Sequence, residues 1–275
     1  MKPSRSVVDQ SIPKILAQID PVWGGLGTGM KFPQVSVFRF LLQSGDPKAV
    51  EAALKTCRRM MDGGIYDQVM GGFHRYAVDQ EWLVPHFEKM LYDQAQLMEL
   101  YLDAWQITGE QEFRQVVEGI ANYVLRDLTH PEGGFYCAQD AQSEGKEGKC
   151  FCWTEGELSA LLTADEMKVA REILGVSEEG NFIDQSDPEP LPNLNILSFK
   201  KPRTDLSESE TKSVTGIFKK LAEVRGKRVP PATDDKILAS WNGLMIGAMA
   251  RTGRVLSEPK YLKAARRAHN FIKGR

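Results

Sequence analysis

Apolar and polar positions recur along this chain with the period of amphipathic helices. Three segments carry an apolar stripe opposite a charged face, and each opens with an acid and a short polar lead: 47–62, 111–127 and 258–273. Each follows a segment that is apolar over more of its circumference, at about 34–43, 86–105 and 235–252. The pattern predicts helical hairpins, with the more apolar helices in a buried inner ring and the charged helices outside.

The loops between these hairpins share a Gly-Gly-Phe sequence, at 71–73 and 133–135. Glycine permits backbone angles that other residues resist, so we expect the aromatic ring to fold back and plug the end of the helices. Residues at about 140–232 interrupt the hairpin rhythm with two Thr-x-x-Glu capping-box patterns, a loop rich in Pro, Asp and Asn, and a polar helix at 208–225. The sequence therefore predicts an all-α domain with a loop-rich insertion.

Composition narrows the function. The 275-residue chain has a formal net charge of −2, which provides no broad basic field for nucleic acid. No apolar run approaches the roughly 20 residues of a membrane-spanning helix, and the first residues lack the apolar core of a secretory signal. We expect a cytoplasmic protein without a membrane or nucleic-acid partner. The four cysteines form no Cys-x-x-Cys pair, so we expect structural thiols, no metal and no cofactor.

Candidate catalytic chemistry concentrates between Gly71 and Asp93. Pro85 suits the first position of a helix, which would place His86 and Asp93 on one face at the mouth of the inner ring. Because polar groups at such a mouth usually line a cavity, we take these two as catalytic candidates. Four further polar residues of the stretch are substrate-binding candidates: His74, Arg75, Glu88 and Lys89. A solvated Glu88–Lys89 pair and a loop-fixing ion pair of Arg75 are the alternatives.

A second set of candidates follows the second Gly-Gly-Phe loop and opens the last inner helix. Asp140 and Asp235 are catalytic candidates, because carboxylates on separate elements divide acid from base in glycoside chemistry. Asp234, Trp241 and Asn242 are substrate-binding candidates, although a helix N-cap explains Asp234 equally well. We expect both sets of candidates to line one pocket at the loop end of the helices.

The same segments resemble the signature of the thioredoxin-domain-containing, spermatogenesis-associated family (DUF255, YyaL-like). The resemblance is carried by GGFHRYAVDQEWLVPHFEKMLYDQAQL, by GGFYCAQDAQSEGKEGKCFCW and by DDKILASWNG, and it spans nearly the whole chain. It implies an incomplete (α/α)6 toroid of the six-hairpin glycosidase type over residues 1–275. In that interpretation the N-terminal thioredoxin-like domain and the C-terminal hairpins of the family are absent.

The resemblance also implies a carbohydrate-active domain related to sugar isomerases and epimerases or to glycosidases. Its partners would be a small carbohydrate ligand and the thioredoxin-like domain of the full-length protein. In an epimerase, His86 would move a proton at a carbon next to a carbonyl group. In a glycosidase, Asp140 would work with Asp234 or Asp235. The alternative is a non-catalytic helical scaffold for the thioredoxin-like domain, and we expect the incomplete toroid to be inactive by itself.

Overall fold

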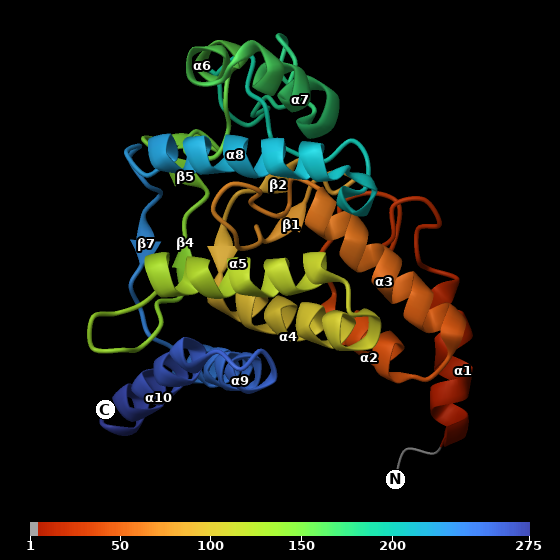
Figure 1. Ribbon diagram of the computed structural model, residues 1–275. Helices are drawn as coiled ribbons and strands as arrows, with labels where there is room; N and C mark the ends of the chain where they lie inside the picture. Colours follow the sequence, from red (N-terminus) through yellow and green to blue (C-terminus); the bar gives the residue numbers. More distant parts are fainter. Residues whose placement is uncertain (1–4) are drawn as a thin grey trace.

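The computed structural model describes residues 5–275, and its helices are arranged as hairpins (Figure 1). After α1 (Arg5–Leu16), three pairs follow in chain order: α2 (Val35–Gln43) with α3 (Pro47–Asp62), α4 (Leu91–Thr108) with α5 (Gln111–Asp127), and α9 (Ala239–Val255) with α10 (Pro259–Lys273). Helix α4 packs against α2, α5 and α9. The more apolar helices α2, α4 and α9 thus form a continuous inner row, which confirms the predicted all-α, incomplete (α/α)6 toroid.

The outer helices begin and end where the sequence predicts. Asp46 caps α3 by accepting hydrogen bonds from the N–H groups of Lys48 and Ala49, and Pro47 occupies the first turn. The inner helix α4 begins at Leu91 instead of 86, and that predicted start is wrong, because His86 and then Lys89 and Met90 pair as short strands. Helix α9 begins at Ala239, close to the predicted start at about 235.

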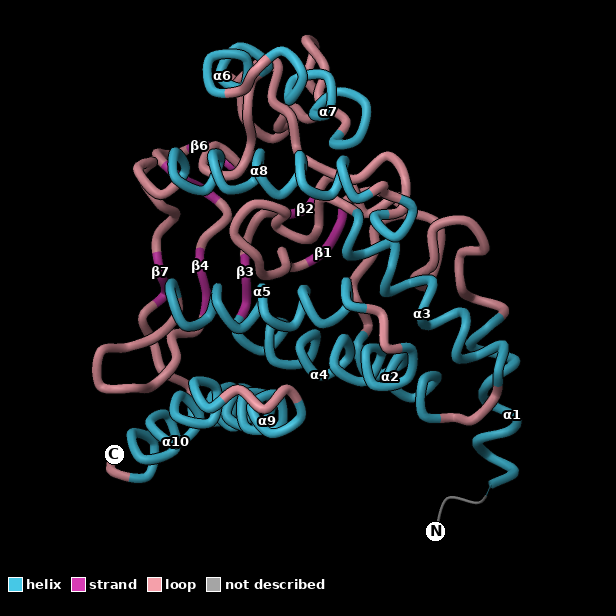
Figure 2. Tube along the Cα trace, viewed as in Figure 1, coloured by secondary structure: helices cyan, strands magenta, loops and turns pink. Residues whose placement is uncertain are grey.

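The strands have two residues each and lie in the segments that connect the helices (Figure 2). One antiparallel sheet joins β3 (Lys89–Met90), β4 (Ala138–Gln139) and β7 (Thr233–Asp234), with Lys89 opposite Gln139 and Ala138 opposite Asp234. Two hairpins complete the set: β1 (Tyr76–Ala77) with β2 (Pro85–His86), and β5 (Gln142–Ser143) with β6 (Lys146–Glu147). The sheet therefore ties the entries of α4 and α9 together.

The segment between β4 and β7 builds a second apolar core. It contains α6 (Glu155–Leu161), α7 (Ala164–Leu174), the 3-10 helix η1 (Arg203–Asp205) and α8 (Glu208–Arg225). The predicted capping boxes of α6 and α7 are confirmed, and α8 has a third one. The buried Trp153 belongs to this core, and Figure 1 shows α6, α7 and α8 together at the end of the molecule away from α10.

Each Gly-Gly-Phe loop is held by one amide side chain of the inner helix that follows it. Gln94 of α4 accepts the N–H of Phe73 at 2.8 Å and donates to its carbonyl oxygen at 2.7 Å. Asn242 of α9 holds Phe135 in the same way, at 2.8 and 2.9 Å. Both phenylalanine rings are fully buried, as the sequence predicts. Gly72 has a φ of 81°, and a Cβ there would lie 2.6 Å from the ring of Tyr123, so only glycine fits this position.

One flank of the inner row remains open to solvent. Leu244 of α9 and Leu238, just before that helix, are exposed large apolar side chains. The sequence predicts an exposed apolar flank of this kind. Among residues 5–275, none of the helices combines the length and the apolar character needed to cross a bilayer.

Candidate functional site

Segment 85–90, which carries the candidates His86, Glu88 and Lys89, is extended. Pro85 and His86 pair with β1, and Met90 still has extended backbone angles (φ −100°, ψ 136°) immediately before α4. The prediction that Pro85 begins a helix, with His86 and Asp93 on one helical face, is therefore wrong. Strand pairing satisfies the backbone hydrogen bonds that a helix would otherwise supply.

Alternation along this extended segment sorts its side chains into two groups. His86 and Glu88 are partly exposed, whereas Phe87 and Lys89 are buried. The neighbouring loop behaves alike, since His74 is buried while Arg75 reaches Glu88 with 2.9 Å between Nη1 and Oε2. His74 and Arg75 thus differ in burial, and Arg75 forms the ion pair that is the alternative to its substrate-binding role.

His86 is oriented by a carboxylate from the β5–β6 hairpin. Its Nδ1 lies 2.9 Å from Oε1 of Glu147, and the same oxygen accepts the backbone N–H of Phe87 at 3.2 Å. The ring stacks on Tyr76 at 5.1 Å between centroids, and Nε2 lies 3.8 Å from Oε2 of Glu88. The hydrogen bond with Glu147 raises the pKa of His86 above its usual value. This arrangement gives an imidazole with one nitrogen fixed and the other directed at a second carboxylate.

Asp93, in the first turn of α4, supplies a carboxyl group of altered acidity that interacts with Arg75 and Glu88. Burial raises the pKa of Asp93 to about 7, the positive charge of Arg75 opposes that rise, and Glu88 adds to it. Oδ2 of Asp93 is buried without a hydrogen-bond partner in the structure, as is Nε of Arg75. Unsatisfied buried polar atoms of this kind cost free energy unless a ligand or water meets them. Asp93 is thus suited to donate a proton near neutral pH.

Aromatic rings flank these polar groups. Tyr92 of α4 hydrogen-bonds Arg75 and packs edge-on against Trp241 of α9, with 4.8 Å between ring centroids. On the other side of His86, a groove of about 650 Å³ is lined by Tyr76, His86, Glu147 and the segment 181–186 of the insertion. Apolar ring faces beside hydrogen-bonding groups suit a ligand with both kinds of surface. Two other tryptophans, Trp82 and Trp153, are fully buried core residues.

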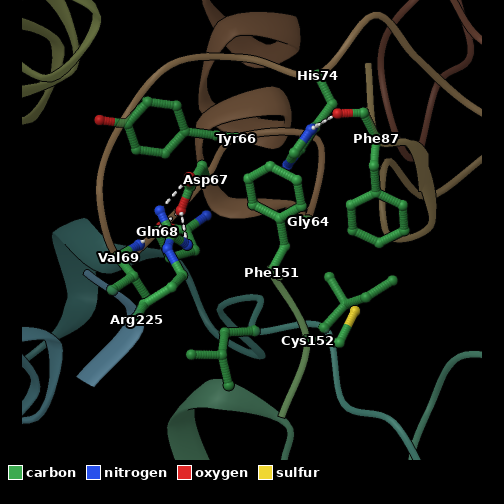
Figure 3. Close-up of a pocket in the computed structure, with 12 residues that line it drawn as sticks. Gly64, Tyr66, Asp67, Gln68, Val69, His74, Phe87, Phe151, Cys152 and Arg225 are labelled. Atoms are coloured by element: carbon green, nitrogen blue, oxygen red, sulfur yellow. Dashed lines mark hydrogen bonds and ion pairs between the residues drawn. The ribbon is translucent and has the colours of Figure 1, made fainter. Parts of the chain in front are cut away.

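Three predicted substrate-binding residues are held in structural contacts. Asn242 is fully buried by its hold on Phe135, and Lys89 is buried against Asp67, with 2.7 Å between Nζ and Oδ2. Nδ1–H of His74 donates to the carbonyl oxygen of Phe87 at 2.8 Å (Figure 3), and burial lowers the pKa of His74 to about 3. None of these three side chains lines the groove beside His86.

The predicted hydrolytic carboxylates do not join the His86 group in the part of the chain that the structure describes. Asp140, Asp234 and Asp235 are exposed at the ends of β4 and β7. Asp234 pairs with Lys236 at 2.9 Å, and that hydrogen bond lowers its pKa, opposite to what an acid catalyst needs. The structure therefore brings together Arg75, His86, Glu88 and Asp93 from the predicted set.

Two members of the site escaped the sequence-based prediction. Glu147 has no sequence signal that would connect it with His86, because the contact spans 61 residues. Tyr92 is adjacent to Asp93 and presents no motif of its own. Across residues 5–275, no cluster of three His, Cys, Asp or Glu side chains is arranged to hold a metal ion.

Comparison with known proteins gives curated relatives but no matching family model. The chain is 37% identical to spermatogenesis-associated protein 20 of Homo sapiens over 92% of its own length, and equally to the Mus musculus protein. It spans 36% of the length of these relatives.

One solved structure with the same fold is a carbohydrate enzyme. A family 76 glycoside hydrolase (mannosidase) from Bacteroides thetaiotaomicron matches 97% of this chain and 52% of its own, at 12% identity and a TM-score of 0.55. The cellobiose 2-epimerase of Spirochaeta thermophila matches 98% and 84%, at 16% identity and a TM-score of 0.41. At these identities the mannosidase likeness concerns the fold alone.

Proposed function

This chain belongs to the spermatogenesis-associated protein 20 family, and we propose that it is a carbohydrate-active domain that moves a proton at a sugar carbon next to a carbonyl group. The observation that carries the proposal is the group formed by His86, Glu147, Arg75, Glu88 and Asp93 at the entry of α4. A glycoside-hydrolase-like fold supports a carbohydrate ligand, and the rings of the site suit a sugar face.

The proposed chemistry divides acid from base. Nε2 of His86 would take the proton from the carbon, and Glu147 would stabilise the imidazolium that forms. Asp93, whose pKa burial raises to about 7, would give its proton to the carbonyl oxygen, and the substrate would become an enediol. Return of a proton to the same or the neighbouring carbon would then complete an epimerisation or an isomerisation. Arg75 would fix the substrate beside Glu88.

Proton transfer is favoured over glycoside hydrolysis by the state of the carboxylates. Hydrolysis needs an acid and a second carboxylate facing one bond. Asp140 and Asp235 are exposed, and Asp234 is paired with Lys236, so the pair anticipated from the sequence is not assembled around His86. The raised pKa values of His86 and Asp93 suit a base and an acid that work on one small substrate.

Proton exchange in D2O tests this proposal without requiring full turnover. Although we expect no full turnover from the incomplete toroid, this half-reaction needs only the His86 group, so we expect the 275-residue chain to introduce deuterium at the carbon next to the carbonyl of a reactive aldose or ketose. The exchange is followed by proton NMR. His86→Ala should lower the exchange rate by ~10²- to 10⁴-fold. Asp140→Asn is the matched control, because Asp140 is exposed and outside the group, and it should leave the rate unchanged.

The other outcomes discriminate between functions. Release of reducing sugar from glycosides, lost in Asp93→Asn, would identify a hydrolase. Absence of exchange, hydrolysis and sugar binding would favour a scaffold that serves the rest of the longer protein. The resemblance to thioredoxin-domain-containing proteins makes a thioredoxin-like domain the partner that we propose in that case.

A further inference from the structure

Two loops of this chain repeat one arrangement built around a buried lysine. Asp20–Gly25 and Asp67–Gly72 share the sequence Asp-x-Val-x-Gly-Gly. In each, the aspartate Oδ1 accepts the N–H groups two and three residues later, and its backbone exchanges hydrogen bonds with the two glycines. A lysine then bonds the aspartate Oδ2 and the first glycine's carbonyl oxygen: Lys31 in the first loop and Lys89 in the second. The two loops serve as mutual controls.

The two copies differ in their charge balance. Lys31 and Asp20 form a pair of one cation and one carboxylate, with Lys31 also facing the ring of Trp82 at 5.7 Å. In the second copy, Arg225 at the end of α8 joins the pair and grips both oxygens of Asp67, at 2.8 and 2.6 Å (Figure 3). All three side chains are buried there, so two cations share one carboxylate. The first copy shows that this loop geometry does not require the second cation.

The additional positive charge faces a cavity. A cavity of about 260 Å³ is lined by Lys89 and Arg225 at its floor, and by Arg126, Arg228, Cys150 and Pro230 among others. The carboxylates that face these cations are already engaged, Asp127 by Arg126 and Glu157 by Arg228. The four cations are Lys89, Arg126, Arg225 and Arg228, and the three carboxylates that pair with them are Asp67, Asp127 and Glu157, so one positive charge has no counter-charge. A buried, uncompensated charge is costly for a folded protein.

The cations at the floor also have hydrogen-bonding capacity to spare. Arg225 uses one N–H on the sulfur of Met70 and two on Asp67, which leaves two of its five N–H groups without an acceptor. Lys89 uses two of its three N–H groups on oxygen, with the rings of Tyr123 and Phe151 nearby at 4.4 and 5.0 Å. Donors with a net positive charge, buried beside an open volume, fit an oxyanion.

We propose that this cavity binds a small oxyanion, such as a phosphate or carboxylate group, between Arg225 and Arg126. Lys89 lines this cavity and His86 does not, and the side chains of these two residues alternate to opposite sides of the extended segment 85–90. The cavity is therefore a second site, independent of the proposed proton-transfer chemistry. An anion there would neutralise the remaining charge and take up the unused N–H groups of Arg225.

Isothermal titration calorimetry with inorganic phosphate, at constant ionic strength, tests the proposal. We expect saturable binding to the 275-residue chain, and parallel titrations with acetate decide between a phosphate and a carboxylate ligand. Arg225→Met should weaken binding by ~10-fold or more, because a charge-assisted hydrogen bond is lost. Since Arg225 is buried and its loss could unfold the domain, Arg126→Gln provides the second variant, with several-fold weaker binding expected. Arg126 is partly exposed and lies at the cavity rim.

Arg114→Gln is the matched control. Arg114 lies on the same helix α5, is similarly exposed, and has a carboxylate partner in Glu118, but it is outside the cavity. Phosphate and acetate affinities should be unchanged in this variant, and circular dichroism should confirm folding of all three. The proposal is overturned if neither anion binds the wild-type chain at millimolar concentration, or if Arg126→Gln binds as tightly as Arg114→Gln.

Discussion

Replacing Asp67 by Asn should destabilise the fold more than the same replacement of Asp20, although the two aspartates make the same hydrogen bonds within their loops. Asn keeps the side-chain volume and one oxygen acceptor but loses the negative charge. At position 20 it leaves one buried cation, Lys31, without a counter-charge. At position 67 it leaves two, Lys89 and Arg225, and these two then repel each other.

The expected magnitudes follow from these contacts. Removing one partner of a buried ion pair costs about 3–5 kcal/mol, because the other charge remains buried. Asp20→Asn should lie near the lower end, since it breaks one charge-assisted hydrogen bond of 2.7 Å. Asp67→Asn also breaks the two bonds with Arg225, each hydrogen bond to a charged group contributing ~1.5–3 kcal/mol. We therefore expect Asp67→Asn to be at least about 1.5 kcal/mol more destabilising than Asp20→Asn.

Urea unfolding at pH 7, followed by circular dichroism and tryptophan fluorescence, measures the difference. With a slope of ~3 kcal/mol per molar urea, the midpoints of the two variants should differ by about 0.5 M or more. Burial raises the pKa of Asp67, but Arg225 and Lys89 outweigh burial and hold it well below 3.8. A carboxyl group with a depressed pKa stabilises above its unfolded pKa, and this stabilisation is lost as the pH falls through the folded value. The deficit of Asp67→Asn should accordingly shrink below about pH 4. Equal midpoints for the two variants at pH 7 would refute the reasoning.

Three further predictions concern the site and its support. Glu147→Gln should lower the pKa of His86, which NMR titration measures. Because that pKa is raised in the folded protein, the pair stabilises the fold below pH ~6.5, and this stabilisation is lost as the pH rises through the folded value. The loss of stability in the variant should therefore be larger at pH 5 than at pH 9. Gln94→Leu should cost ~2–4 kcal/mol in urea unfolding, because the N–H and C=O of Phe73 are both left buried without partners, whereas an unchanged midpoint would contradict the role of the amide. The pKa of Asp93 is raised to about 7 in the folded protein, so the fold should lose stability as this carboxyl group ionises between pH 4 and 7. Asp93→Asn should flatten that decline in stability. A decline that persists in the variant would assign it to another group.

The helical part of the fold could be predicted from the sequence because its information is local. An apolar stripe with an acid just before it defines 47–62 and 111–127, and the structure has helices with those bounds. The strands could not be predicted, because each has only two residues and those of the three-stranded sheet pair with partners far along the chain. Lys89 pairs with Gln139, and Ala138 with Asp234. Periodicity cannot reveal a two-residue strand, and therefore the helix was extended back over His86.

The part of the candidate site that could be predicted is the part built from residues close together in the sequence. Arg75, His86 and Glu88 meet because β1 and β2 form a local hairpin, which keeps them close in sequence and in space. Glu147 comes from a different hairpin, and only the folded chain shows that it orients His86. The sequence does contain the repeat Asp-x-Val-x-Gly-Gly at 20–25 and 67–72, and its recognition would have indicated a structural role for Lys89.

Residue type alone overestimated the number of ligand-binding side chains. His74, Lys89 and Asn242 are polar residues close to the expected mouth, yet each satisfies a backbone or ionic group inside the protein. A loop that turns on two glycines leaves backbone N–H and C=O groups facing inward, and these need partners. Polar side chains that face such a loop, whether adjacent in sequence like His74 or far along the chain like Asn242, are therefore needed for the loop itself. Side chains with unsatisfied hydrogen-bonding capacity, such as Asp93 and Arg225, are left to meet a ligand.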